Sequence, residues 1–151
     1  MDNPLVQIRD AVIKLLKGLD PEVDVFFEEI KSTDEEHGIA EKETYYFVDI
    51  IPNINDTVDG YFTDKGVLVD IAYHERNESN TAYLIKAEEL DGAIRPVLSF
   101  GDRHITVSGL SSRVTDHVLH CSFSVIFRQA RVAVNGFQKM GELEVAINKG
   151  G

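Results

Sequence analysis

The sequence predicts an α+β fold, in which two helices pack on one face of a mixed, largely antiparallel sheet with a C-terminal strand or arm. Two segments carry apolar residues at the three- and four-residue steps of an amphipathic helix, and the others alternate apolar and polar residues as strands do. Their order, α-β-β-β-α-β-β plus a tail, is typical of helices layered on such a sheet. With 151 residues, of which 43% are hydrophobic, the chain predicts one domain over residues 1–151, with residues 129–151 as its arm.

The first predicted element is a helix that begins at Pro4, with Gly18 as its expected stop and a turn at Asp20-Pro21. Asn3 suits the N-cap, and proline suits the first helical position because the N–H it lacks would have no partner there. Apolar residues then recur on one face, which predicts the side that packs on the core. They are Leu5, Ile8, Val12, Leu15 and Leu19.

Three strands are predicted next, over about residues 22–29, 43–51 and 62–74. The second has apolar side chains on both faces, which favours a central position in the sheet, and Pro52 is expected to end it. Residues 53–60 then form a turn-rich connection. The third strand presents one apolar row, formed by Val67, Val69, Ile71 and Tyr73.

A second helix is predicted over about residues 79–95, with capping residues before it and Pro96 as its stop. Strands over about residues 103–109 and 117–128 follow, joined by a hairpin turn near Asp116. The apolar face of the helix is predicted to carry Tyr83, Ala87, Leu90 and Ile94.

The tail of the chain ends in a short alternating segment. Residues 129–141 show little periodicity, whereas the residues after them alternate apolar and polar side chains. This pattern fits a final strand or arm. Its candidate contacts are Leu143, Val145 and Ile147.

Negative charge is concentrated in the first 60 residues. The net charge is −11, and residues 1–60 hold 15 acids and 5 bases, a net −10. Because basic side chains supply most nucleic-acid affinity, this balance argues against a DNA-binding protein. Residues 31–42 have no period, which predicts a long exposed loop, and they lack the alternating ligands and turn glycine of a calcium site. The acids of this loop are Asp34, Glu35, Glu36 and Glu41.

The motifs give no catalytic, cofactor or metal site. The single cysteine, Cys121, excludes an internal disulfide, and its place on an apolar strand face predicts that it fills the core. No apolar run approaches the roughly 20 residues of a membrane helix, and the acidic start is unlike a signal peptide, so we expect a soluble protein made inside the cell. One alternative stays open, a small-molecule-binding or hydrolytic domain that uses Asp70, His74 and His104 near a shared pocket.

Several segments together resemble a known family. The first helix and strand read IRDAVIKLLKGLDPEVDVFFEEIK, and the next two strands read TYYFVDIIPN and GVLVDIAYHE. Nearer the end the chain reads DHVLHCSFSVIFR and KMGELEVAIN. In order and pattern the sequence is similar to the tail terminator, or tail completion, proteins of tailed phages and prophages of Gram-positive bacteria. The segment from Gln129 to Lys139 is longer than that pattern, which leaves the role of the arm open.

The resemblance implies a structural protein of the phage tail and not an enzyme, with no cofactor. Tail terminators form a ring, commonly of six subunits, that caps the tail tube, stops its polymerisation and presents a docking surface to the head connector. The expected partners are therefore further copies of the chain, the tail tube protein and the head–tail connector, assembled in the cytoplasm of the bacterial host. Another head–tail connector component is a second interpretation.

Under this resemblance the acidic loops gain a role. DNA would pass through the ring without specific binding, because a negative lumen repels its phosphates. The acids of residues 31–42 are candidates for the lumen rim, and Asp56 and Asp59 are candidates for a second acidic loop at the lumen or an interface. The alternative interpretation is simple solubility, which net charge also supplies.

Overall fold

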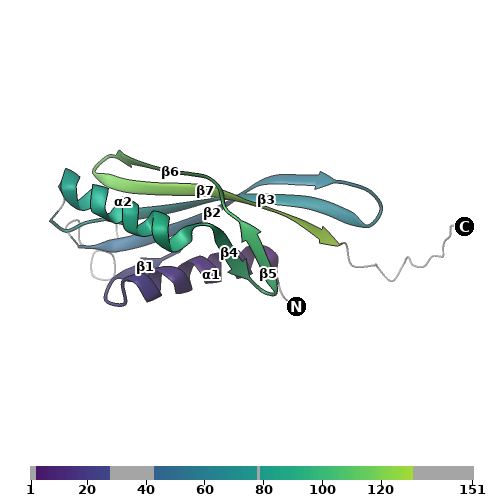
Figure 1. The fold of residues 1–151 in the computed structure, drawn as a ribbon, viewed down its shortest axis with the longest axis horizontal. Coiled ribbons are helices and arrows are strands. Elements are labelled where there is room, and N and C mark those ends of the chain that lie inside the picture. Colours follow the sequence, from purple (N-terminus) through teal and green to yellow (C-terminus); the bar gives the residue numbers. More distant parts are fainter. Residues whose placement is uncertain (1–2, 28–42, 78, 131–151) are drawn as a thin grey trace, which may run out of the picture. The chain divides into compact units, whose positions relative to one another are not determined.

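A computed structural model describes residues 3–27, 43–77 and 79–130. Its elements are α1 (Pro4–Leu19), β1 (Asp24–Phe26), β2 (Tyr45–Thr57), β3 (Phe62–His74), α2 (Asn80–Ile94), β4 (Val97–Phe100), β5 (Arg103–Thr106), β6 (Ser108–Thr115) and β7 (Val118–Ala130). A five-stranded sheet has the order β1-β2-β3-β7-β6, and β4 pairs with β5 in a two-stranded sheet (Figure 1). Because β1 is parallel to β2 while β6 is antiparallel to β7, the larger sheet is mixed, and the predicted α+β class is confirmed.

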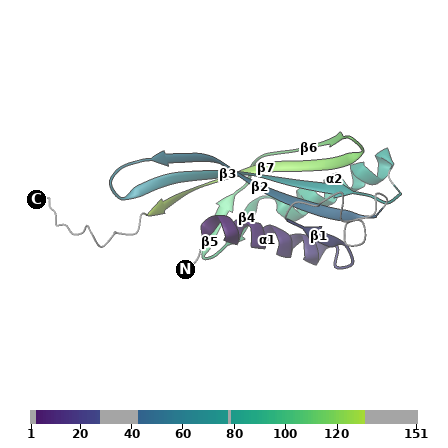
Figure 2. The same ribbon diagram turned by 180° about the vertical axis from the view of Figure 1, so that it is seen from behind.

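The chain divides into two compact units, which are described separately. The core unit comprises residues 1–53 and 66–125, and the hairpin unit comprises residues 54–65 and 126–151. In the core unit, α1 lies against β1 and β4 in both views (Figures 1 and 2). The prediction that residues 1–151 form one domain stays a prediction.

Helix α1 begins where the sequence predicts. The Asn3 side chain accepts hydrogen bonds from the backbone N–H groups of Leu5 and Val6, at 2.9 and 3.2 Å, and so caps the helix. The buried line differs from the prediction, because Leu16 is fully buried, whereas Leu5, Leu15 and Leu19 are only half-buried. A four-residue step turns the direction of the side chain by about 40°, so the buried line drifts from one leucine to the next. The fully buried residues of α1 are Ile8, Val12 and Leu16.

Strands β1 and β2 both depart from the predicted bounds. A strand was predicted over residues 22–29. In its described part, only Asp24–Phe26 form a strand, which pairs with residues 45–47 of β2. Strand β2 lies between β1 and β3, as its two apolar faces predict. The prediction that Pro52 ends this strand is wrong, since β2 continues to Thr57. In the described residues β1 stops pairing at Phe47, so Pro52 lies where β2 forms an edge, and a missing N–H costs no ladder bond there.

The core lies between the sheet and the two helices. Strand β3 buries its predicted row, and Cys121 of β7 is fully buried, as predicted. Ser79 caps α2 by accepting a hydrogen bond from the N–H of Ala82 at 3.0 Å. The buried face of α2 confirms three predicted residues but contains Lys86 where Ala87 was expected. Its buried residues are Tyr83, Lys86, Leu90 and Ile94.

The last third of the described chain contains one more hairpin than predicted. Strand β4 was not predicted, and the strand expected over residues 103–109 is divided between β5 and the start of β6. The turn near Asp116 is confirmed: Asp116 and His117 have φ values of 53° and 65°, as both central residues of a type I′ hairpin turn require. Residues 129 and 130 belong to β7, and the rest of the predicted arm lies outside the described residues.

Candidate functional site

A buried cation links the two helices in the core unit. Lys86 is only 8% exposed, and its Nζ lies 2.7 Å from Oδ2 of Asp20 and 2.9 Å from Oε1 of Glu89. The same Nζ lies 4.8 Å from the ring centroid of Tyr73 and 5.9 Å from that of Tyr46, which places it within cation–π range of both. Since Asp20 immediately follows α1 and Lys86 is in α2, these contacts join the end of one helix to the middle of the other.

The protonation states of this cluster follow from its hydrogen bonds. Burial by itself would raise the pKa of Asp20, but hydrogen bonds from Lys86 and from the Tyr46 hydroxyl outweigh it, and the pKa lies below its usual value. Burial would likewise lower the pKa of Lys86, but the Asp20 and Glu89 carboxylates raise it. Burial and the nearby Asp20 raise the pKa of Tyr46, so its hydroxyl stays protonated. The cluster is therefore a hydrogen-bonded set of charges that joins the end of α1 to α2.

The residues of the alternative small-molecule site do not come together. Asp70 pairs with Nδ1 of His120 at 3.1 Å. His74 stacks on the ring of Tyr45, with centroids 5.3 Å apart, and His104 lies in the two-stranded sheet, where its Nδ1 is 2.7 Å from the hydroxyl of Ser99. Among the residues that the structure describes, no three His, Cys, Asp or Glu side chains are grouped as metal ligands. Each of the three candidates thus has a separate local partner.

The hairpin unit carries an exposed aromatic tip, which we define as residues 58–62. The Asp59 carboxylate accepts hydrogen bonds from the backbone N–H groups of Tyr61 and Phe62 at 2.7 and 3.0 Å. The N–H of Val58 donates to the carbonyl of Phe62 at 3.0 Å, which closes the turn. Although these hydrogen bonds organise the turn, Tyr61 is 75% exposed, Val58 41% and Phe62 39%. The turn therefore holds three large apolar side chains in water.

An ion pair supports the base of this tip. Arg128 of β7 donates from Nε and from a terminal guanidinium nitrogen to the two carboxylate oxygens of Asp64, at 2.8 and 3.3 Å. Its guanidinium also lies 6.0 Å from the ring centroid of Phe62. The hydrogen bond from Arg128 lowers the pKa of Asp64, and the same bond raises the pKa of Arg128.

The predicted acidic loop at residues 53–60 needs correction. Asp56 is an exposed residue of strand β2, and Asp59 organises the turn, because the strand runs on past Pro52. Both acids thus lie at the end of a hairpin and not in an irregular connection. The other candidate acids lie outside the described residues, as do the candidate arm contacts. They are Asp34, Glu35, Glu36, Glu41, Leu143, Val145 and Ile147.

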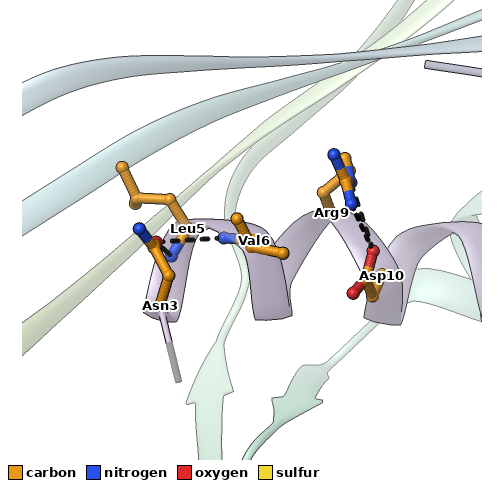
Figure 3. Close-up of polar contacts among 5 residues, drawn as sticks. All are labelled: Asn3, Leu5, Val6, Arg9 and Asp10. Carbon is orange, nitrogen blue, oxygen red and sulfur yellow. Dashed lines mark hydrogen bonds and ion pairs between the residues drawn. The ribbon is translucent and has the colours of Figure 1, made fainter. Parts of the chain in front are cut away.

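A shallow groove lies in the core unit between the start of α1 and the middle of β2. Its volume is about 230 Å³, and its walls are mainly apolar. Figure 3 shows Leu5 and Arg9 on the same side of the helix, as residues four apart are. We call it the α1–β2 groove, and its walls are formed by Asn3, Leu5, Val6, Arg9, Ile50 and Pro52.

Arg9 is the single charged residue of the α1–β2 groove walls. Its guanidinium is 3.0 Å from the carboxylate of Asp10 and 4.5 Å from the ring centroid of Phe27 (Figure 3 shows the first contact). The side chain is about one-third exposed and lies beside the apolar walls as one partner of an ion pair with Asp10.

Comparison with known proteins decides the family. The sequence matches the family described as phage tail terminator protein over residues 7–136. The chain belongs to the phage tail terminator family. One solved structure resembles this tail terminator with a TM-score of 0.46 and 17% sequence identity. The aligned region covers 87% of this chain and 97% of the chain of that structure. A comparison with curated proteins gives no match.

The family gives this tail terminator a structural role in tail completion. It is a component of the phage tail that interacts with other tail and head components, as the resemblance implied. The Gram-positive origin stays a prediction. In the described ranges, no helix is long and apolar enough to cross a membrane.

Two features of the site were not anticipated from the sequence. The first is the exposed aromatic tip, although the Asp59-Gly60 pair between two apolar runs is itself a hairpin signal that could have located the turn. The second is the buried Lys86, which no local pattern indicates, because its partner Asp20 is 66 residues away in the chain.

Proposed function

We propose that this tail terminator assembles into a closed ring, with six copies as the number common in its family. The ring caps the finished tail tube, stops its polymerisation and offers its other face to the head–tail connector. The observation that carries this proposal is the family match over residues 7–136, which spans most of the chain.

Two exposed apolar surfaces support assembly into a ring. The aromatic tip exposes Tyr61, and the α1–β2 groove has the 40% exposed Val6 in its wall. Exposed apolar patches bounded by polar residues are typical of protein–protein interaction sites. When two different surfaces meet on successive copies, the assembly closes into a ring if the rotation between copies allows it.

The acidic loops support passage of DNA through the ring. Under the proposal the acids of residues 31–42 line the lumen and repel the DNA phosphates, so that the genome slides without binding. Asp56 and Asp59 are exposed side chains of the hairpin unit, and we assign them to an interface between copies.

The proposal is tested by adding the purified protein to growing tail tubes. Light scattering gives the mass of the protein alone and with tubes, and negative-stain images give the tube lengths and the occupancy of tube ends. The expected result is a ring at one end of each tube and tubes that stop growing, whereas tubes without the protein continue to grow. A protein that stays monomeric and never binds tube ends would contradict the proposal.

A further inference from the structure

We propose that the aromatic tip of one copy inserts Tyr61 into the α1–β2 groove of a second copy. This inference rests on the proposed ring, and it adds which two surfaces meet and which side chain anchors them. The occupant of the groove is therefore another copy of this chain and not a small molecule.

The tip is organised before it binds. Asp59 accepts two backbone hydrogen bonds across the turn, and Arg128 holds Asp64 at its base. Tyr61 therefore stands on an ordered turn, and its side chain has only two torsion angles to fix on binding. Less conformational freedom is lost when such a preorganised group binds than when a flexible one does.

The groove has the size and chemistry for one aromatic ring. A closed cavity of roughly 150 Å³ is enough to bind benzene in an engineered protein, and the groove has a volume of about 230 Å³ but is shallow, so a phenol ring would lie against its walls without being enclosed. Leu5, Ile50 and Pro52 supply apolar walls, and Asn3 supplies a polar rim. A tyrosine that fills an apolar pocket is a common energetic centre of protein interfaces.

The charges of the two surfaces are complementary. Residues 54–65 contain three acids and one base, whereas the charged residue of the groove walls is Arg9, whose guanidinium also contacts the neighbouring Asp10. The first turn of α1, which forms one wall, also has no acidic residue to offset the positive end of the helix dipole. Opposite charges of this kind steer the approach of two surfaces and fix their orientation.

Each copy carries one tip and one groove, and the two are different surfaces. A tip-to-groove contact is therefore head-to-tail, and a closed ring uses every tip and every groove, while an open chain leaves one of each exposed. Closure thus removes the exposed aromatic side chain from water in all subunits.

The test places one cysteine on each surface and mixes the two variants. Val58→Cys changes the tip and keeps Tyr61, since Val58 is a 41% exposed neighbour of the anchor. Val6→Cys changes the groove wall. The native Cys121 is buried, and burial raises the pKa of its thiol, so it contributes little background. Under mild oxidation the mixture is expected to give disulfide-linked dimers that neither variant gives alone. Leu84→Cys, at a 61% exposed position of α2, mixed with Val6→Cys supplies the background level.

The outcomes separate this inference from the ring proposal. Linked dimers several-fold above the Leu84→Cys background, in a preparation that forms rings, support the contact. Rings with no excess of linked dimers overturn the contact and leave the ring proposal standing. A chain that is monomeric with and without tube ends overturns both.

A second measurement places alanine at Tyr61 of the tip and, as a control, at Leu84 of α2. Tyr61→Ala is expected to raise the protein concentration at which half of the subunits are assembled about tenfold or more, because an interface anchor is lost. Leu84→Ala is expected to leave this concentration unchanged. Circular dichroism of both variants checks that they are folded. Equal effects of the two substitutions would overturn the role of the tip.

Discussion

The two units of the molecule each contain a carboxylate–cation pair, and the pairs differ mainly in burial. Lys86 and Asp20 in the core unit approach to 2.7 Å, and Arg128 and Asp64 in the hairpin unit approach to 2.8 Å. The side chains of the first pair are 10% and 25% exposed, against 55% and 36% for the second. Nearly equal distances therefore occur in very different surroundings.

This difference assigns the pairs different roles. Water screens an exposed pair, so it adds little to the free energy of unfolding, whereas a buried ion that loses its partner destabilises the fold strongly. The pair of Lys86 and Asp20 is expected to stabilise the fold, and the pair of Arg128 and Asp64 to organise the aromatic tip locally. A subunit that assembles through an exposed tip needs both a stable fold and an ordered tip.

The largest effect is expected from Lys86→Met. The substitution keeps an unbranched side chain but leaves the Asp20 carboxylate half-buried without its cation, so the free energy of unfolding should fall by about 2–3 kcal/mol. Urea unfolding at pH 7 measures it. Lys14→Met, the same change at an exposed position of α1, should change it by less than about 0.5 kcal/mol. A loss no larger than in the Lys14 control would show that the buried pair adds nothing.

A smaller, pH-dependent effect is expected from Asp20→Asn. The pKa of Asp20 is lowered from an ordinary value near 3.8, so its contribution is present above that pH and is lost as the pH falls through the lowered pKa. The pKa of Lys86 is raised from 10.5, so its contribution is present below that pH and is lost as the pH rises through the raised pKa. The free energy of unfolding of wild type should exceed that of the variant by about 1–2 kcal/mol between roughly pH 5 and 10. This difference should become smaller below and above that pH range.

The measurement is urea unfolding of both proteins across that pH range. Comparing wild type with the variant at each pH removes the titration of the other carboxylates, which the two proteins share. A difference that stays constant down to about pH 2.5 would contradict the lowered pKa of Asp20.

Local patterns in the sequence were enough for most of the core unit. Asn3 and Pro4 indicate the start of α1, and the alternation of apolar and polar residues in β3 predicts which of its side chains are buried. Both predictions succeed because capping and strand periodicity depend only on neighbouring residues. Asp116 also marks its turn. The predicted end of β2 at Pro52 failed because the effect of a proline depends on whether a strand pairs at that residue, which is a property of the whole sheet.

The candidate site was less predictable for the same reason. Lys86 looks like a solvent-facing residue of α2 until Asp20 and two tyrosine rings are placed around it, and these come from distant segments. The exposure of Tyr61 likewise depends on β2 and β3 extending to a shared turn. The burial of a side chain depends on tertiary contacts with distant segments, whereas the periodicity of the sequence depends only on residues that are close in the chain.

Tyr83→Phe and Tyr61→Phe make the same change in the two units. The Tyr83 hydroxyl donates to the carbonyl of His117 at 2.6 Å and so ties α2 to the β6–β7 turn. Removing it should cost about 1 kcal/mol of unfolding free energy, the usual net value of a neutral hydrogen bond. Tyr61→Phe removes a hydroxyl from an exposed side chain and should leave the free energy of unfolding unchanged. Thermal or urea unfolding checks both, and equal losses would remove the distinction between the units.

The smallest effect on global stability is expected from Arg128→Ala. The side chain is exposed, so the urea midpoint of the whole protein should not change measurably, but the hairpin unit loses the group that holds Asp64 and covers Phe62. Amide hydrogen exchange followed by mass spectrometry should therefore show faster exchange confined to peptides that contain residues 58–64.

Asp64→Asn separates a local role of this pair from a general loss of charge. If the pair acts as a unit, Asp64→Asn should speed exchange in the same peptides as Arg128→Ala, and the double variant should be no faster than either single one. Additive effects would mean that the two residues support the tip independently. A drop in the global midpoint comparable to that of Lys86→Met would mean that the exposed pair stabilises the whole fold, and the contrast between the two units would then not depend on burial.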